Sequence, residues 1–213
     1  MKKAVIFDMD GVLVDNADVH VEAFEMFCKS KNVDISGEKL RSYFGMGNED
    51  IFRELWGSDL TIEQINDFAA QKEAIYREIY AHTIKPVEGL VEIMKAIKAS
   101  GAKIAIGSSG ITANVQFVIE KCGLSPYIDA IANGDMITKA KPDPEVFLLA
   151  ARLLDIEPTE CVVFEDSFAG VAAARSAGMK VIALTTTYPR ESHKDYDFLI
   201  DDFTQISIEQ ILS

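Results

Sequence analysis

Short runs of apolar residues recur along the chain, and longer stretches between them repeat apolar positions at helical spacing. An apolar run without in-and-out alternation is typical of a strand buried on both faces of a parallel sheet. We therefore predict strands at residues 3–7 (KAVIF), 103–107 (KIAIG), 161–165 (CVVFE), 180–184 (KVIAL) and 198–200 (FLI).

The segments between these runs carry signals for helix ends. One helix is predicted to begin at Pro86 and to end at Gly101, and a second ends at Gly123. A third follows Pro144, and an alanine-rich fourth ends at Gly178. Strands that alternate with helices in this way predict an α/β fold with a doubly wound, Rossmann-like parallel sheet.

Residues 16–84 interrupt the alternation, because their pattern is helical throughout. Thr61 and Gln64 stand at the spacing of a capping box, which predicts that a long helix begins there. The sequence thus predicts two domains: a core of residues 1–15 and 85–213, and a helical domain of residues 16–84 inserted after the first strand.

Composition narrows the classes of partner. The chain has 213 residues with 34 acidic and 21 basic side chains, a formal net charge of −13. Nucleic acids and anionic membrane surfaces are disfavoured, because no basic stripe is present. No segment has the length of a signal-peptide core or a transmembrane helix, and the three cysteines lack metal-ligand spacing. We expect a cytoplasmic protein, a monomer or weak homodimer, with Cys28 and Cys161 as buried thiols.

Chemically active side chains stand where the predicted strands end. Asp8 and Asp10 follow the first strand, and Glu165 and Asp166 lie at the end of the strand at 161–165. Lys141 lies in a proline-containing loop before that strand. Because ligands of open parallel sheets bind beyond the carboxyl ends of the strands, we expect these side chains to converge.

Four carboxylates would repel one another in such a site, and one lysine would not balance them unless a further cation entered. Oxygen ligands of this kind suit Mg²⁺, and an anionic phosphate substrate would need the same cation. Ser108 and the backbone N–H groups that open the following helix could hold phosphate oxygens. Asp8 could then act as a nucleophile that forms an aspartyl phosphate, while Asp10 exchanges protons with the leaving group and with water. The pattern predicts phosphoryl transfer.

Four segments resemble the sequence motifs of the haloacid dehalogenase superfamily, in the same order and across essentially the whole chain. The helical segment after the first motif resembles the small cap domain of that superfamily, and Asp10 is typical of its phosphotransferases. DMDGVLVDN, His20 and AGVAAARSAGM are similar to the branch that holds β-phosphoglucomutase and sugar-phosphate phosphatases. The four motifs are FDMDGVLVDN at 7–16, IGSSG at 106–110, the Lys141-Pro142 pair and FEDS at 164–167.

The resemblance implies a role for each matched acid. Asp8 is the nucleophile and a Mg²⁺ ligand. Asp10 is the general acid/base and gives its backbone carbonyl to the metal. Asp166 ligates Mg²⁺, and Glu165 supports the metal directly or through water.

The resemblance also implies how the phosphoryl group is held. Ser108 and Lys141 are expected to bind it, and Ser109 and Gly110, which complete the second motif, are expected to contact the substrate. The implied activity is Mg²⁺-dependent hydrolysis of a small phosphorylated metabolite, such as a sugar phosphate.

Three residues of the helical domain are candidate substrate contacts. His20 is either a satisfied core histidine or a neighbour of Asp10 that influences its proton affinity. Lys72 falls on the apolar face of the long helix, where it requires an anionic partner, contacts substrate or extends to solvent. Asn48 ends a polar, glycine-containing loop, residues 45–48, that is suited to lining a substrate pocket.

Two departures from the branch favour a phosphatase over its alternative, a β-phosphoglucomutase-type sugar phosphomutase. Asn48 stands near the position where a mutase is expected to carry an arginine for the second phosphate, and asparagine lacks that charge-assisted, bidentate contact. Lys72 or Arg53 could supply the charge instead. Asn16 replaces a hydroxyl residue, and with Asp15 it is expected to form a hinge and the N-cap of the next helix.

Two other classes of protein share part of the pattern. A signalling receiver domain also places a phosphorylatable aspartate on a doubly wound sheet, but its acidic pair precedes that aspartate and it has no large helical insert. The DxDG segment also resembles the start of a calcium-binding loop of a structural metal-binding module, but Gly11 comes too early and the later ligands are absent. Both classes are disfavoured.

Overall fold

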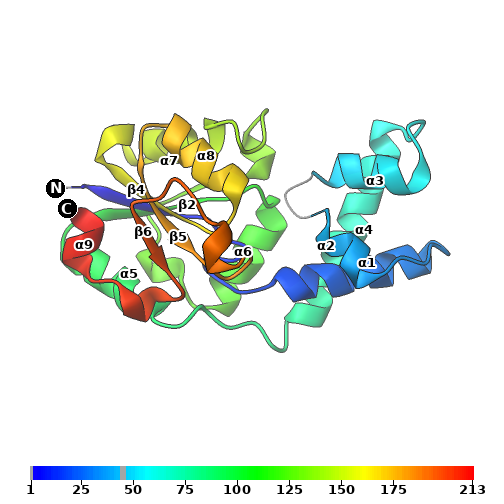
Figure 1. Cartoon of the computed structure of the whole chain (residues 1–213), viewed down its shortest axis with the longest axis horizontal. Helices are drawn as coiled ribbons and strands as arrows, with labels where there is room; N and C mark the ends of the chain where they lie inside the picture. Colours follow the sequence, from blue (N-terminus) through cyan, green and yellow to red (C-terminus); the bar gives the residue numbers. More distant parts are fainter. Residues whose placement is uncertain (1, 44–46) are drawn as a thin grey trace. The chain divides into compact units, whose positions relative to one another are not determined.

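The computed structural model describes residues 2–43 and 47–213. The chain divides into two compact units, Met1–Asp15 with Ile84–Ser213, and Asn16–Thr83. The first unit contains a sheet flanked by helices, and the second is helical (Figure 1). Among the residues described, no helix combines the length and the apolar character that crossing a membrane requires.

Six parallel strands form the sheet of the first unit, in the order β3-β2-β1-β4-β5-β6. β1 lies between β2 and β4, and each of its residues is buried. The doubly wound parallel sheet expected from the apolar runs is therefore confirmed. The strands are β1 (Ala4–Phe7), β2 (Lys103–Gly107), β3 (Ala130–Ala132), β4 (Cys161–Glu165), β5 (Lys180–Leu184) and β6 (Phe198–Ile200).

Helices cover both faces of this sheet. In Figure 1, α7 and α8 lie over one face, while α5 and α9 lie over the other. Short 3₁₀ turns complete the connections. The helices are α5 (Leu90–Ala99), α6 (Thr112–Lys121), α7 (Glu145–Leu154), α8 (Phe168–Ser176) and α9 (Ile208–Leu212). The 3₁₀ turns are η1 (Ser125–Tyr127), η2 (Gly134–Met136), η3 (Pro158–Glu160), η4 (Arg190–Ser192) and η5 (Phe203–Gln205).

Two elements differ from the sequence prediction. β3 was not predicted, because it spans only three residues, of which only Ala132 is buried. The helix predicted to begin at Pro86 begins instead at Leu90. Its N-cap, Gly89, has a φ of 78°, and a Cβ there would lie 2.9 Å from the backbone of Phe203. The left-handed backbone at this glycine therefore sets the start of the helix, and Pro86 belongs to the segment leading into it.

The register of the central strands brings their carboxyl ends to one level. Phe7 of β1 pairs with Ile106 of β2 on one side and with Phe164 of β4 on the other. One residue beyond β1, the Asp8 N–H still donates to the Phe164 carbonyl at 3.0 Å. Side chains that follow these three strands consequently emerge at the same edge of the sheet.

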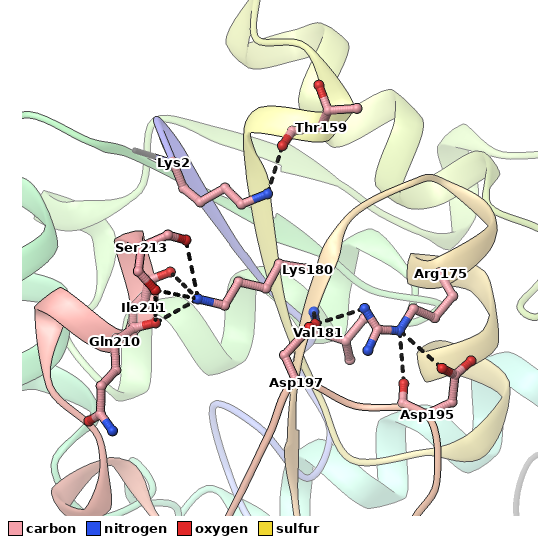
Figure 2. Close-up of polar contacts among 10 residues, drawn as sticks. All are labelled: Lys2, Thr159, Arg175, Lys180, Val181, Asp195, Asp197, Gln210, Ile211 and Ser213. Carbon is pink, nitrogen blue, oxygen red and sulfur yellow. Dashed lines mark hydrogen bonds and ion pairs between the residues drawn. The ribbon is translucent and has the colours of Figure 1, made fainter.

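The opposite, amino edge of the sheet is closed by charged side chains that bind backbone groups (Figure 2). Lys180, the first residue of β5, donates from Nζ to the Gln210 carbonyl at 2.6 Å and to the Ser213 hydroxyl at 3.0 Å. Asp197 accepts the Val181 N–H at 2.8 Å and pairs with Arg175 at 2.7 Å. These contacts hold α8 and α9 to the start of β5.

The helical unit has its own aromatic core. Phe27, Phe52, Trp56 and Phe68 pack ring against ring, with centroids 5.2–6.0 Å apart. Tilted and edge-on ring pairs of this kind stabilise a core beyond what the burial of the rings contributes. The helices are α1 (Ala17–Ser30), α2 (Gly37–Arg41), α3 (Asn48–Trp56) and α4 (Ile62–Tyr80).

The ends of α4 and α1 test two sequence predictions. The capping box is confirmed, since Thr61 and Gln64 exchange side-chain and backbone hydrogen bonds at 2.9 and 3.2 Å. The cap expected from Asn16 is wrong in its chemistry. Asn16 occupies the N-cap position of α1, but its side chain makes no capping hydrogen bond among the described residues. It donates instead to the Tyr76 hydroxyl of α4 at 2.7 Å.

Candidate active site

Asp8 lies at the centre of the carboxyl edge. It follows the four buried residues of β1, and 7% of its surface is exposed. Its Oδ1 is 2.7 Å from Nζ of Lys141, which comes from the loop before α7. Residues 133 positions apart in sequence therefore form one buried ion pair.

Lys141 binds a second carboxylate as well. Its Nζ is 2.7 Å from Oε1 of Glu165 and lies over the ring of Phe147, 4.7 Å from the centroid. The other oxygen of Glu165, Oε2, accepts the Asp166 N–H at 2.8 Å and the Ser167 N–H at 2.7 Å. Both oxygens of Glu165 are thus engaged by protein donors.

Glycines allow these carboxylates to lie against backbone. A Cβ at Gly170, in the first turn of α8, would lie 1.6 Å from Oε1 of Glu165. A Cβ at Gly11, whose φ is 72°, would lie 2.0 Å from Oδ2 of Asp166. Any side chain at either position would displace an acid of the site.

Three of the acids form a group of the size that holds a metal ion. Carboxylate oxygens of Asp8, Glu165 and Asp166 lie within 4.8 Å of one another, and all three residues are buried. Hard oxygen ligands at such spacing fit Mg²⁺. The donor set alone therefore suits the cation that the sequence predicts.

The electrostatics of the group show the same deficit of positive charge. Burial, assisted by Glu165 and Asp10 and opposed by Lys141, raises the pKa of the Asp8 carboxyl to about 7. Burial and the charges of Glu165 and Asp8 raise the pKa of Asp166 well above its usual range. Burial disfavours the charged form of Lys141, but Asp8 and Glu165 outweigh it and raise its pKa. One lysine does not neutralise the acids around it, so a bound cation would stabilise their ionised forms.

Asp10 stands in the turn that follows β1. This turn is closed by the Gly11 N–H, which donates to the Val14 carbonyl at 2.8 Å, and by a bridge between Asp10 and Val14. Asp10 is half-buried, and its charge contributes to the raised pKa of Asp8. The two aspartates of the first motif thus share one electrostatic environment.

The second motif forms a compact turn after β2. Ser108 is buried, and its Oγ accepts the Gly110 N–H at 2.9 Å, while Ser109 is exposed. The first N–H of α6, at Thr112, donates to the Asp135 carboxylate at 2.8 Å. The sequence predicted that N–H groups at this helix start could hold phosphate oxygens, but the Thr112 N–H is already bound by a protein carboxylate.

The candidate residues of the helical unit surround a carboxylate that the sequence analysis missed. Lys72, 3% exposed, is 2.9 Å from Oε1 of Glu73 and 3.0 Å from Nδ1 of His20. The Asn48 side-chain amide lies 3.5 Å from the same Glu73 oxygen, and His20 stacks on Tyr76 at 4.1 Å. The anionic partner that a buried lysine requires is therefore its own neighbour on α4. Of the predicted pocket-lining loop at 45–48, Gly45 and Met46 lie outside the described residues.

A further polar segment follows β5. Residues 185–187 are three consecutive threonines, and the Thr187 hydroxyl lies close to the Asp166 carboxylate beside Gly11. The sequence signal was available, since these hydroxyls follow a predicted strand, but none of the four motifs includes them.

Fold and site place the chain among α/β enzymes that gather carboxylates and a lysine at the carboxyl edge of a parallel sheet. Residues 2–178 match the model of the haloacid dehalogenase-like hydrolases, and the chain belongs to this family. The enzyme class expected from the sequence, a phosphoric monoester hydrolase of the haloacid dehalogenase type, is confirmed.

Individual relatives match most or nearly all of the chain. Protein CbbY of Rhodobacter capsulatus is 33% identical over 220 residues, which cover 98% of this chain and 97% of CbbY. A phosphorylated carbohydrates phosphatase of Thermotoga maritima is 29% identical over 180 residues, 84% of this chain and 83% of its own. The crystal structure of β-phosphoglucomutase from Clostridium difficile superimposes with a TM-score of 0.86 at 26% identity, covering 99% of this chain and 96% of that one.

One relative is much longer than this chain. Protein SUPPRESSOR OF QUENCHING 1 of Arabidopsis thaliana, a chloroplastic protein, is 32% identical over 220 residues. The match covers 99% of this chain but only 20% of that protein.

Proposed function

We propose that this protein is a Mg²⁺-dependent phosphatase that hydrolyses a small phosphorylated metabolite, a sugar phosphate, through an aspartyl phosphate on Asp8. The observation that carries the proposal is the buried contact of Asp8 with Lys141 beside Glu165 and Asp166, at the edge where ligands of parallel sheets bind. The name of the Thermotoga maritima relative, a phosphorylated carbohydrates phosphatase, supports the substrate class.

Catalysis by these residues takes two displacements. An Asp8 carboxylate oxygen attacks phosphorus, the bond from phosphorus to the ester oxygen breaks, and Asp10 donates a proton to the departing alcohol. Asp10 then removes a proton from water, whose oxygen attacks the aspartyl phosphate and releases inorganic phosphate and the free Asp8 carboxylate. Each bond formed to phosphorus is thus matched by one broken, and the proton on Asp10 returns.

Positive charge and hydrogen-bond donors accompany these steps. Lys141 orients Asp8 in the free protein and binds the phosphoryl group with Ser108 during transfer, while Glu165 holds Lys141 in place. Asp8, Asp166 and the Asp10 carbonyl, with the support of Glu165, would hold Mg²⁺, which would supply charge neutralisation when bound. Its chemistry agrees with the acids that the site leaves uncompensated.

The helical unit, Asn16–Thr83, is proposed to act as a cap that selects the substrate. His20, Asn48 and Lys72 are its proposed contacts, and Ser109 and Gly110 are those of the core. The pairing of Lys72 with Glu73 suits a substrate with a single phosphate, because the lysine charge is already balanced.

A sugar phosphomutase of the β-phosphoglucomutase type is the second candidate, favoured by the TM-score of 0.86 to that enzyme. Asn48 and the neutralised Lys72 oppose it, since a bisphosphate intermediate needs a cationic site for its second phosphate. Incubation with β-glucose 1-phosphate and catalytic bisphosphate separates the two. Free phosphate indicates a phosphatase, and glucose 6-phosphate indicates a mutase.

A screen of phosphorylated metabolites for Mg²⁺-dependent phosphate release tests the proposal, with Asp8→Asn as the variant. We expect the variant to retain its fold and lose turnover, and an active Asp8→Asn enzyme would refute the aspartyl phosphate. Asp155→Asn is a matched control, because Asp155 ends α7 with a φ of 56°, a conformation that asparagine also adopts.

A further inference from the structure

Three consecutive threonines follow β5 and reach three different partners. Glu165 of β4 pairs with Ala183 of β5, so the segment 185–187 emerges beside the acids of the site. Thr185 donates to the Asp201 carboxylate at 2.5 Å, and Thr186 donates to the Gly11 carbonyl. The Thr187 hydroxyl lies close to the Asp166 carboxylate and opposes the rise in the pKa of Asp166.

Gly11, Asp166 and Thr187 meet at one point. A Cβ built on Gly11 would lie 2.0 Å from Oδ2 of Asp166 and 2.9 Å from Oγ1 of Thr187. Asp166 is 4% exposed, and its carboxylate lies beside both the turn after β1 and the Thr187 hydroxyl. Backbone on one side and a donor on the other restrict the rotation of this carboxylate.

Asp166 needs such a restraint because its neighbours repel it. Glu165 and Asp8 lie within metal-binding distance of it, and Lys141 contacts those two acids rather than Asp166. Electrostatic repulsion therefore favours rotation of the Asp166 carboxylate away from the other two. A hydroxyl group that donates a hydrogen bond to the carboxylate opposes that rotation without adding a charge to the site.

We infer that Thr187 is a positioning residue that holds the Asp166 carboxylate in the orientation required for Mg²⁺, while Thr186 fixes the turn that carries Asp10 and Gly11. Hydrogen bonds to ligating carboxylates strengthen metal binding, and their loss typically lowers metal affinity or activity by about 10–100-fold. The inference rests on the proposed function, since it assigns Asp166 to Mg²⁺.

The test compares Thr187→Val, which removes the hydroxyl at nearly constant volume, with Thr187→Ser, which keeps it. The Mg²⁺ dissociation constant is measured by titration calorimetry without substrate, and the Mg²⁺ concentration for half-maximal phosphate release is measured separately. We expect Thr187→Val to weaken Mg²⁺ binding by about tenfold or more, and Thr187→Ser to restore most of the affinity. Thr187→Ala serves as a second hydroxyl-free variant if the valine is poorly accommodated.

Thr185→Val is the matched control. It removes a hydroxyl of the same segment whose partner, Asp201, is exposed and outside the metal group. Its Mg²⁺ affinity should equal that of the unaltered protein. Hydroxyl-free variants of Thr187 that bind Mg²⁺ normally would overturn the inference alone, as would a serine that fails to rescue. A wild-type protein that binds no Mg²⁺ would overturn both this inference and the proposed function.

Discussion

Lys141 and Glu165 form an ion pair of 2.7 Å in which both side chains are almost completely buried. The lysine also contacts Asp8, and the glutamate also accepts backbone N–H groups of the following turn. Glu165 thus links the turn before α8 to Lys141, and Lys141 links Glu165 to Asp8. The geometry of the proposed nucleophile depends on residues from three separate segments of the chain.

Removal of Lys141 should impair both catalysis and folding. Lys141→Ala leaves Asp8 and Glu165 buried without their cation, and breaking a buried pair costs about 3–5 kcal/mol. Loss of an electrostatic contact to the reacting group should lower kcat by about 10²–10³-fold. Steady-state phosphate release and urea unfolding measure the two effects. Lys139→Ala is the control, because the Lys139 side chain is 70% exposed and pairs with Asp143 at 3.5 Å; equal effects of both changes would contradict the prediction.

Substitution of Gly11 should separate backbone strain from damage to the site. Gly11→Ala and Gly123→Ala both place a side chain at positive φ, 72° and 66°, which costs about 1–2 kcal/mol. At Gly123 a Cβ meets nothing within 4 Å, whereas at Gly11 it collides with Asp166. We expect comparable strain in urea unfolding, with an added loss of stability and of phosphate release in Gly11→Ala alone. Normal hydrolysis by that variant would show that the collision is relieved without cost.

The buried pair of the helical unit predicts a large change in stability. Glu73→Gln leaves the 3%-exposed ammonium of Lys72 without its carboxylate, and we expect a loss of about 3–5 kcal/mol in the free energy of unfolding. The double variant Lys72→Met/Glu73→Leu removes both charges and should recover most of the loss. If Glu73→Gln unfolds at the same urea concentration as the unaltered protein, the pair contributes little.

Asp201 predicts a dependence of stability on pH. Hydrogen bonds from Thr185, Gln205 and Arg190 lower the pKa of its carboxyl to about 2. A folded-state pKa below the unfolded value means that this contribution is complete above the usual pKa of 3.8 and is lost as the pH falls towards 2. The stability difference between the unaltered protein and Asp201→Asn should therefore shrink from pH 5 to pH 2.5 in urea titrations. A constant difference over this range would contradict the assignment.

The sequence predicts most of the core sheet because its strands are continuous apolar runs that end in the acids of the site. Prediction failed at β3, where three alanine-rich residues bury too little to stand out. It also failed at the start of α5, because the signal at Pro86 is overridden by contacts of Gly89 with Phe203, distant in sequence. Long-range packing of this kind leaves no local pattern.

The candidate site, like the sheet, was predicted in part from the sequence. The four motifs name Asp8, Lys141, Glu165 and Asp166, but none of them includes Thr187, although it follows a predicted strand. Glu73 was missed because adjacent residues on a helix normally face different directions, whereas Lys72 and Glu73 are both buried. The side chains that Thr187 and Glu73 lie against are known only from the structure.

At the amino edge of the sheet, the Lys2 N–H donates to the Leu212 carbonyl at 2.8 Å, beside the contacts of Lys180 with α9. The first strand and the last helix are therefore neighbours in space, at the opposite end of β1 from Asp8. A short linker could join them, and the chain could be reopened in an exposed loop such as the one around Gly57, where a Cβ would meet nothing within 4 Å. Such a circular permutant would keep β1 at the centre of the sheet and would turn the interrupted core into one continuous segment.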